Sequence, residues 1–150
     1  MNEYNATARQ TTTVGHLTVL SISPFHEDHV ALRNILGVSR WTTMLKALDV
    51  LSAVPLLRQH EVSVLLCERT LAPGTWLDIL ERLQAMPSPP SLIVTSRNAD
   101  DRLWAEALNL GAWDVLAKPF ERTEVIRSVH AAWQYWHDHI KRARTAAAAG

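Results

Sequence analysis

The sequence predicts an α/β fold built on a five-stranded parallel sheet with helices on both faces. Short apolar runs alternate along the chain with longer segments whose apolar residues recur at helical spacing. The run VSVLLC at 62–67 is apolar almost throughout, as expected of a strand buried on both faces. With 150 residues, of which 47% are hydrophobic, the chain can bury one sizeable core. We therefore expect one doubly wound domain.

Five strands are predicted from runs rich in apolar and β-branched residues. LTVLSI is the first, and the weaker pattern WTTML is the second. The central run VSVLLC is the third, SLIVTS the fourth and WDVLA the fifth. In chain order these strands span 17–22, 41–45, 62–67, 91–96 and 113–117.

Five helices are predicted between and after the strands. Gly37 and Gly111 end the first and the fourth helix, and the PSPP segment at 87–90 stops the third. Val30 is expected on the inner side of the first helix, and Pro55 requires a kink or a late start in the second. The helices span 25–36, 49–59, 75–86, 100–110 and 121 to about 139.

Composition limits the possible settings of the domain. Residues 1–15 are polar and expected to be disordered, 16–138 form the domain, and 139–150 extend the last helix into a frayed tail. Zero net charge argues against a nucleic-acid partner, and no apolar run is long enough to span a membrane. The single cysteine, Cys67, fits a reducing compartment, so we expect a cytoplasmic protein.

The expected strand order is 2-1-3-4-5, which is flavodoxin-like. In such a sheet the functional crevice lies outside the carboxyl ends of the strands, where the strand order reverses. The residues at or just after these ends are Ser23, Glu68, Thr95 and Lys118.

The segment LIVTSRNADDRLWAEALNLGAWDVLAKPF at 92–120 resembles the last third of a receiver domain, the phosphorylatable module of two-component response regulators. The resemblance extends over 16–138. It implies that Thr95 and Lys118 occupy the positions of the family's switch hydroxyl and lysine. It also implies a cis bond between Lys118 and Pro119.

Two features of the phosphorylation site depart from the family pattern. Ser23 and Pro24 stand where the family carries the acidic pair that binds Mg²⁺, so the resemblance implies a degenerate site without metal or cofactor. Their residue types instead suit a helix start, with Ser23 as N-cap, Pro24 at N1 and Glu27 and Asp28 in the first turn.

Glu68 stands where the family carries its phosphoacceptor aspartate. Three interpretations remain open: simple ion pairing with Lys118, permanent mimicry of the phosphorylated charge, and true phosphoacceptance. If Glu68 mimics phosphorylation, it should lie within reach of Lys118 with Thr95 turned toward it. Val115 replaces the family's switch aromatic, which implies one locked conformation.

Six tryptophans include three candidates for a partner-binding face. Trp104 and Trp113 belong to the fourth helix and the fifth strand, and Trp136 lies on the last helix. The resemblance implies that partners dock on the face these elements form, and aromatic anchors suit such a role. Helical spacing fits core packing as well, which we favour for Trp133 and leave open for Trp136.

Other candidate sites are weak. His26 and His29 have metal-binding residue types at i, i+3 spacing, but such a run is more typical of a solvated first turn. Cys67 should point away from the crevice as a buried, inert thiol rather than a redox sensor.

The expected function is an atypical receiver that acts as a protein-interaction module and not as an enzyme. Its implied partners are a histidine kinase, an output domain or another receiver, with a homodimer as one possibility. The alternatives are a phosphoacceptor regulator acting through Glu68 or a shifted residue, and a sensor that binds a small ligand in the vacated crevice.

Overall fold

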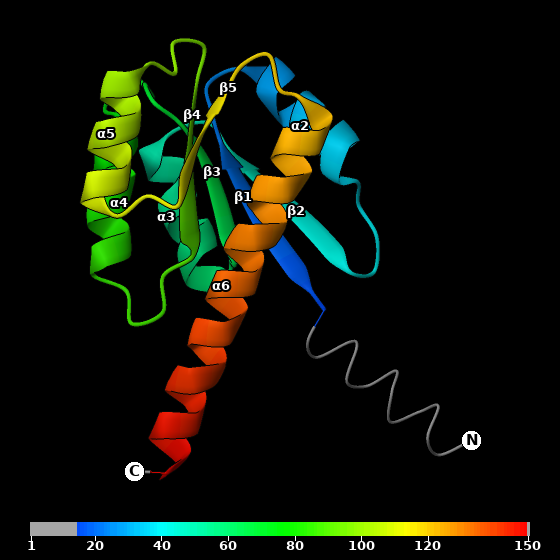
Figure 1. Ribbon diagram of the computed structural model, residues 1–150, viewed down its shortest axis with the longest axis vertical. Coiled ribbons are helices and arrows are strands. Elements are labelled where there is room, and N and C mark those ends of the chain that lie inside the picture. The colour runs from blue at the N-terminus through cyan, green and yellow to red at the C-terminus, as the bar shows by residue number, and fades with distance from the viewer. Residues whose placement is uncertain (1–14, 150) are drawn as a thin grey trace.

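The computed structural model describes residues 15–149, and its five strands form one parallel sheet of order β2-β1-β3-β4-β5 (Figure 1). This confirms the predicted fold class and strand order. The expected disorder of residues 1–14 lies outside the described residues. The elements are β1 (Leu17–Ile22), α2 (His26–Leu36), β2 (Thr42–Ala47), α3 (Val50–Gln59), β3 (Val64–Glu68), α4 (Trp76–Gln84), β4 (Ser91–Ser96), α5 (Asp101–Leu110), β5 (Asp114–Ala117) and α6 (Arg122–Ala149).

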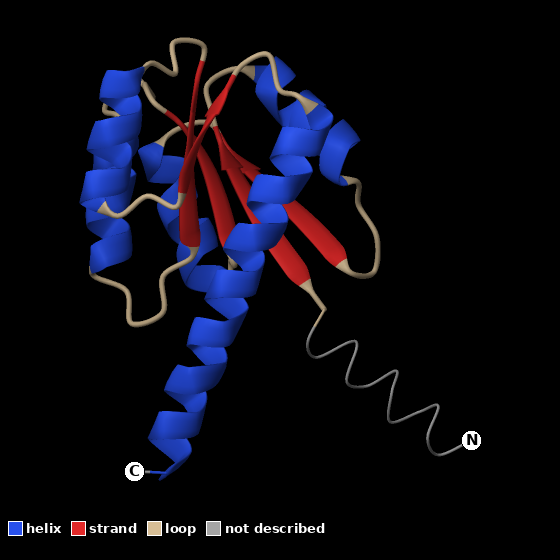
Figure 2. Cartoon of the chain, in the orientation of Figure 1, coloured by secondary structure: helices blue, strands red, loops and turns tan. Residues whose placement is uncertain are grey.

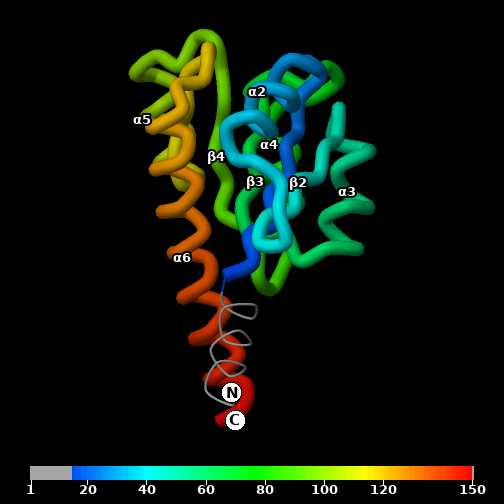
Figure 3. Tube along the Cα trace, turned by 90° about the vertical axis from the view of Figure 1, so that its right-hand side faces the viewer, coloured from blue at the N-terminus to red at the C-terminus, as the bar shows by residue number. Residues whose placement is uncertain are grey.

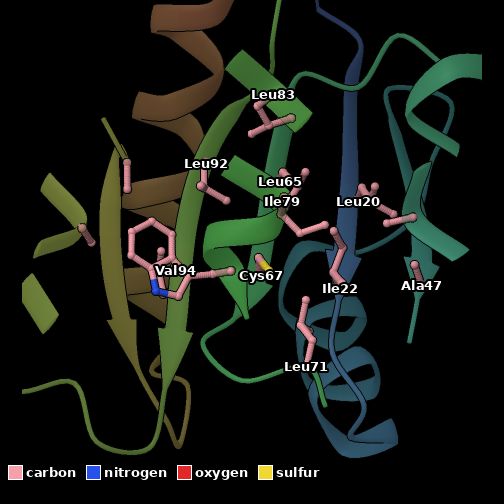
Figure 4. Packing of buried hydrophobic residues seen from close by; sticks show 14 of the residues in the cluster. Leu20, Ile22, Ala47, Leu65, Cys67, Leu71, Ile79, Leu83, Leu92 and Val94 are labelled. Carbon is pink, nitrogen blue, oxygen red and sulfur yellow. The ribbon is translucent and has the colours of Figure 1, made fainter. Parts of the chain in front are cut away.

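The sheet separates two apolar layers. Alternate strand residues point to opposite faces, so Leu65 packs under α3, α4 and α5 while its neighbour Leu66 packs under α2 and α6. Figure 4 shows the first layer, where Leu65 and Val94 lie with Ile79 of α4. These side chains are fully buried, and each contributes roughly 1.5–3 kcal/mol relative to exposure.

The first helix buries most of the stripe that its apolar residues predicted, with Leu32 in the core and Ile35 and Leu36 packed against it. Asp28, His29 and Leu32 are buried in α2, whereas Val30 is 42% exposed, so the expected inward position of Val30 is wrong. Two polar residues face inward because they have hydrogen-bond partners there, and burial is then tolerated.

The second helix spans Val50–Gln59 as predicted, so of the two alternatives for Pro55 a late start does not apply. Asp49 caps it, because its carboxylate accepts a hydrogen bond from the backbone N–H of Ser52 at 2.8 Å. Pro55 lies inside the helix and cannot bond the carbonyl of Leu51. Leu51 is 83% exposed, so water can hydrate that carbonyl.

The last helix continues without a break to Ala149, whereas the sequence predicted a frayed end. Alanine has the highest helix propensity, and Arg144 pairs with Glu61 at 2.8 Å beyond the sheet. In Figure 2 all strand arrows point to one end of the sheet, and α6 projects from the other end, as Figure 3 shows from the side. None of the described helices, α6 included, is both long and apolar enough to cross a membrane.

Candidate functional site

The carboxyl ends of four strands bring the predicted site residues together. Glu68 is the last residue of β3 and lies opposite Thr95 of β4 in the sheet register. Ser23 follows β1 directly, and Lys118 follows β5. The topology therefore brings the side chains of four distant sequence positions together in one crevice.

Lys118 forms the centre of this crevice. Its ammonium lies 2.5 Å from Oε2 of Glu68 and 2.7 Å from Oδ2 of Asp28. The side chain of Lys118 is 5% exposed, and each carboxylate side chain is 9% exposed. One ammonium thus serves two carboxylates, and poor access to water makes each attraction stronger than at the surface.

Each carboxylate also accepts a hydrogen bond from a hydroxyl at a strand end. Ser23 Oγ donates to Oδ2 of Asp28 at 2.7 Å, and Thr95 Oγ1 donates to Oε2 of Glu68 at 3.3 Å. The expected approach of Glu68 to Lys118, with Thr95 turned inward, is present in the structure. These side chains form one continuous series of polar contacts. It runs from the Ser23 hydroxyl through Asp28, Lys118 and Glu68 to the Thr95 hydroxyl.

The expected helix start at Ser23 and Pro24 is wrong. The helix begins at His26, and its N-cap residue Phe25 makes no side-chain capping bond. The Ser23 hydroxyl is already engaged, since it accepts from the backbone N–H of Phe25 at 3.1 Å and donates to Asp28. Pro24 is exposed and lies outside the helix.

Asp28 is the site residue that sequence reasoning missed. It was assigned to a solvated first turn near the positive end of the helix, but the structure buries it against Lys118. Its spacing of four and eight residues from Leu32 and Leu36 places it on the buried stripe. Counting only apolar residues at helical spacing overlooks a carboxylate on that stripe.

His29 is a buried structural residue rather than part of a solvated turn. Its Nε2 lies 2.9 Å from the backbone carbonyl oxygen of Ser23, and its Nδ1 lies 2.9 Å from the Ser21 hydroxyl. A carbonyl only accepts, so Nε2 carries the proton and neutral Nδ1 accepts from Ser21. Burial lowers the pKa of His29. Among the described residues no cluster of three or more histidine, cysteine or acidic side chains could hold a metal.

The Lys118 ammonium has an aromatic neighbour at the mouth of the crevice. It lies 4.8 Å from the ring centroid of Phe25, which is partly exposed. This is within the range of a cation–π interaction. Phe25 therefore adds an aromatic contact to the ammonium that pairs with the two carboxylates.

Two further expectations about residues near the crevice are met. The Lys118–Pro119 peptide bond is cis, as the resemblance implied. Cys67 is fully buried in the layer beneath α4, and burial raises the pKa of its thiol. The burial of Cys67 and the raised pKa fit an inert thiol that faces away from the crevice.

Val115 is buried beside Val94 on the α5 side of the sheet. It has no aromatic ring that could turn in behind Thr95. The expectation of a single conformation stays a prediction.

The three tryptophans of the expected partner face are not equivalent. Trp104 and Trp113 are 37% and 36% exposed, but Trp136 is only 7% exposed and cannot serve as a surface anchor. Tyr135, which sequence reasoning did not single out, lies against Trp113 with ring centroids 5.0 Å apart and ring planes tilted by 32°. Trp133 is partly buried against the α2–α6 layer.

The sequence matches the family model described as "Response regulator receiver domain" over residues 27–130. No curated protein sequence matches the chain significantly.

Solved structures of receiver domains share the fold. The signal receiver domain of an HD domain-containing protein from Pseudomonas fluorescens Pf-5 superimposes with a TM-score of 0.76 at 24% identity, covering 85% of this chain and 94% of that one. A response regulator from Thermotoga maritima gives 0.71 at 18% identity, with coverages of 79% and 98%. Full-length FixJ from B. japonicum gives 0.72 at 21% identity, with 83% of this chain and 61% of FixJ covered.

Replacing Lys118 by methionine should destabilise the protein by about 3 kcal/mol, because two buried carboxylates lose their cation. The matched control is Arg144→Met, which breaks the exposed pair with Glu61 and should cost less than about 1 kcal/mol. Urea unfolding at neutral pH measures both changes. Equal losses in the two variants would show that the shared ammonium contributes no more than a surface pair.

Acid should weaken the fold through His29. Because its folded-state pKa lies below the ordinary value of 6.5, the unfolded chain binds more protons, and stability falls as pH drops below about 6.5 toward the folded pKa. The slope from this one group is at most about 1.4 kcal/mol per pH unit. His29→Gln, which can donate to Ser23, should flatten the dependence of unfolding free energy on pH.

The control is His130→Gln, at an exposed position. In this variant the unfolding free energy should depend on pH as it does in the wild type. An unchanged slope in His29→Gln would contradict the assignment of the acid sensitivity to His29.

Proposed function

The chain belongs to the response regulator receiver family, and from this premise we propose that it is an atypical receiver whose interaction state is set by a permanent charge network. Receiver domains are modules of two-component signal transduction that interact with kinases and output domains. In this proposal the chain does so without Mg²⁺-dependent phosphorylation of an aspartate. The observation that supports it is the pairing of Glu68 with Lys118 in the buried crevice.

The unmodified Glu68 carboxylate contacts the same two side chains, Thr95 and Lys118, that a phosphoryl group at this position would contact. Its carboxylate accepts from Thr95 and from Lys118 at the same oxygen, Oε2. A phosphorylated side chain would carry its negative charge toward the same cation and hydroxyl. Both groups are thus already engaged in the resting protein.

The chemistry of phosphoryl transfer is disfavoured at this site. The attacking oxygen must be free and accurately placed, and metal ions normally neutralise the charge of the transferring group. Glu68 is instead buried and ion-paired, and Ser23 and Pro24 provide no carboxylate. Asp28 is a nearby carboxylate, but Lys118 and Ser23 engage it.

The vacated crevice also offers little support for a small-ligand sensor. The side chains of Lys118, Glu68 and Asp28 fill its centre and are almost inaccessible to water. A ligand would have to displace two ion pairs, at an electrostatic cost.

The partner face that we propose consists of Trp104 of α5, Trp113 beside β5 and Tyr135 of α6. These side chains are exposed, and aromatic residues are enriched at the centres of interfaces. Strand β5 connects the partner face with the crevice, because Trp113 precedes the strand and Lys118 follows it. We propose a homodimer, a histidine kinase, an output domain or another receiver as the partner of this face.

Acetyl phosphate with millimolar Mg²⁺ should add no stable phosphoryl group, and Mg²⁺ alone should leave the melting temperature unchanged. The reasons are the ion-paired Glu68 and the two positions without a carboxylate. Intact-mass measurement and thermal unfolding provide the readouts. One added phosphoryl group that is lost in Glu68→Gln would establish the phosphoacceptor alternative instead.

Glu68→Gln should weaken self-association by severalfold while the fold is retained. The amide keeps the size of the side chain and can still accept from Thr95, but it removes the charge that holds Lys118. Sedimentation equilibrium of wild type and variant measures the dimerisation constants.

Glu61→Gln is the matched control and should leave the dimerisation constant unchanged. Glu61 is exposed and pairs only with Arg144 among the described residues. Trp113→Ala should also weaken the dimer. A wild-type protein that remains monomeric would contradict the homodimer, and equal constants for wild type and Glu68→Gln would contradict control by Glu68.

A further inference from the structure

A cavity of about 720 Å³ lies at the amino ends of the strands, where α6 continues past the sheet (Figure 1). Its walls come from the starts of β1 and β2, the loop between α3 and β3, and the C-terminal half of α6. We call it the basal cavity. Small-molecule sites typically have volumes of about 300–1,000 Å³. Residues that line it include Thr43, His60, Glu61, Ile140, Lys141 and Arg144.

The lining of the basal cavity carries more positive than negative groups. Lys141 and Arg144 are cations, and Glu61 is the only acidic residue among the lining side chains. Glu61 is engaged by Arg144, with 2.8 Å between its Oε2 and Nη2 of the guanidinium. Lys141 forms no ion pair among residues 15–149. The charge of Lys141 is therefore uncompensated within the cavity.

Two further groups at the basal cavity can donate hydrogen bonds. The exposed ring of His60 carries an N–H in either neutral tautomer, and it has no side-chain partner in the part of the chain that the structure describes. Arg144 bonds Glu61 through Nη2, and a guanidinium has five N–H groups, so others remain available. Together with Lys141, these donors come from two sides of the cavity, namely α6 and the loop before β3.

The remaining walls of the basal cavity offer carbon surface. Ile140 and Ala148 of α6 line it with aliphatic groups. The His16 ring is held in place, because its Nδ1 lies 3.2 Å from the carbonyl oxygen of Arg40 and its Nε2 lies 3.0 Å from the Thr43 hydroxyl. With both nitrogens engaged, this ring is a fixed wall. The apolar part of a bound molecule would lose contact with water on these sides.

We propose that the basal cavity binds a small organic phosphate, a molecule with an apolar body and a phosphate group that Lys141, His60 and Arg144 recognise. A phosphate monoester carries negative charge and three strong acceptor oxygens, which match these three donor groups in number. The carbon surface beside them would receive the apolar body. The cavity shares no lining residue with the Glu68 crevice or with the partner face, so the site is independent of the function proposed above.

A phosphate bound in this way would join two elements that otherwise meet through one exposed ion pair. Lys141 belongs to α6 and His60 to the loop between α3 and β3, where Glu61 already pairs with Arg144. A ligand that binds the folded protein and not the unfolded chain stabilises the fold in proportion to the logarithm of its concentration. Binding should therefore raise the melting temperature.

Phenyl phosphate, inorganic phosphate and phenol test the two parts of the site separately. Isothermal titration calorimetry at neutral pH should show phenyl phosphate binding at least about tenfold more tightly than either fragment, because it alone meets both the cationic and the apolar walls. Benzoate, with a single charge and two oxygens, should bind more weakly than phenyl phosphate. Inorganic phosphate or benzoate that binds as tightly as phenyl phosphate would overturn the proposal, as would phenyl phosphate that fails to bind at millimolar concentration.

Variants locate the site. Lys141→Met should weaken phenyl phosphate about tenfold, the loss expected for one charge-assisted hydrogen bond. Glu61→Gln should tighten binding severalfold, because it removes the only carboxylate of the lining. Both residues are exposed, so the fold should be retained.

The matched control is Lys46→Met, which removes an exposed lysine of β2 outside the basal cavity and should leave the affinity unchanged. Equal weakening by Lys46→Met and Lys141→Met would show that phenyl phosphate responds to net charge and not to this cavity. Weaker binding in Glu61→Gln would also contradict the site.

Discussion

One ammonium group connects the two faces of the crevice. Lys118 follows the last strand and pairs with both Asp28 of α2 and Glu68 of β3. These two carboxylates belong to elements that are far apart in the sequence. A single cation facing two carboxylates leaves one negative charge uncompensated within the group. The hydroxyls of Ser23 and Thr95 stabilise that excess, because each donates to one of the carboxylates. The positions of α2, β3 and the loop after β5 therefore depend on one another.

This arrangement differs from an ordinary surface ion pair in its response to solvent. The three charged side chains are nearly inaccessible, and the Phe25 ring lies 4.8 Å from the ammonium. Salt screens exposed charges effectively and buried ones much less. A signalling state based on this group would consequently depend less on ionic strength than an interface formed by surface charges.

The sequence predicted the order of the elements because strand and helix periodicities are determined locally. Gly111 ended its helix as expected, and Glu68 and Lys118 could be placed together because parallel strands share an end. Asp28 could not be placed in this way, since its burial depends on a lysine ninety positions later. Trp136 was also undecidable from spacing. An aromatic residue at a helical repeat fits a core and an interface equally, and only the folded structure, in which Trp136 is 7% exposed, determines which applies.

The continuous α6 has a geometric consequence. An α-helix turns by about 100° and rises about 1.5 Å per residue, so its 28 residues form a rod of about 42 Å. The α6 helix would therefore fix both the distance of a reporter domain joined rigidly after Ala149 and its rotation about the helix axis. One inserted residue would swing that domain by more than a quarter of a revolution, whereas seven would nearly restore its heading. The rod makes the angular setting of such a fusion a quantity that can be chosen by counting residues.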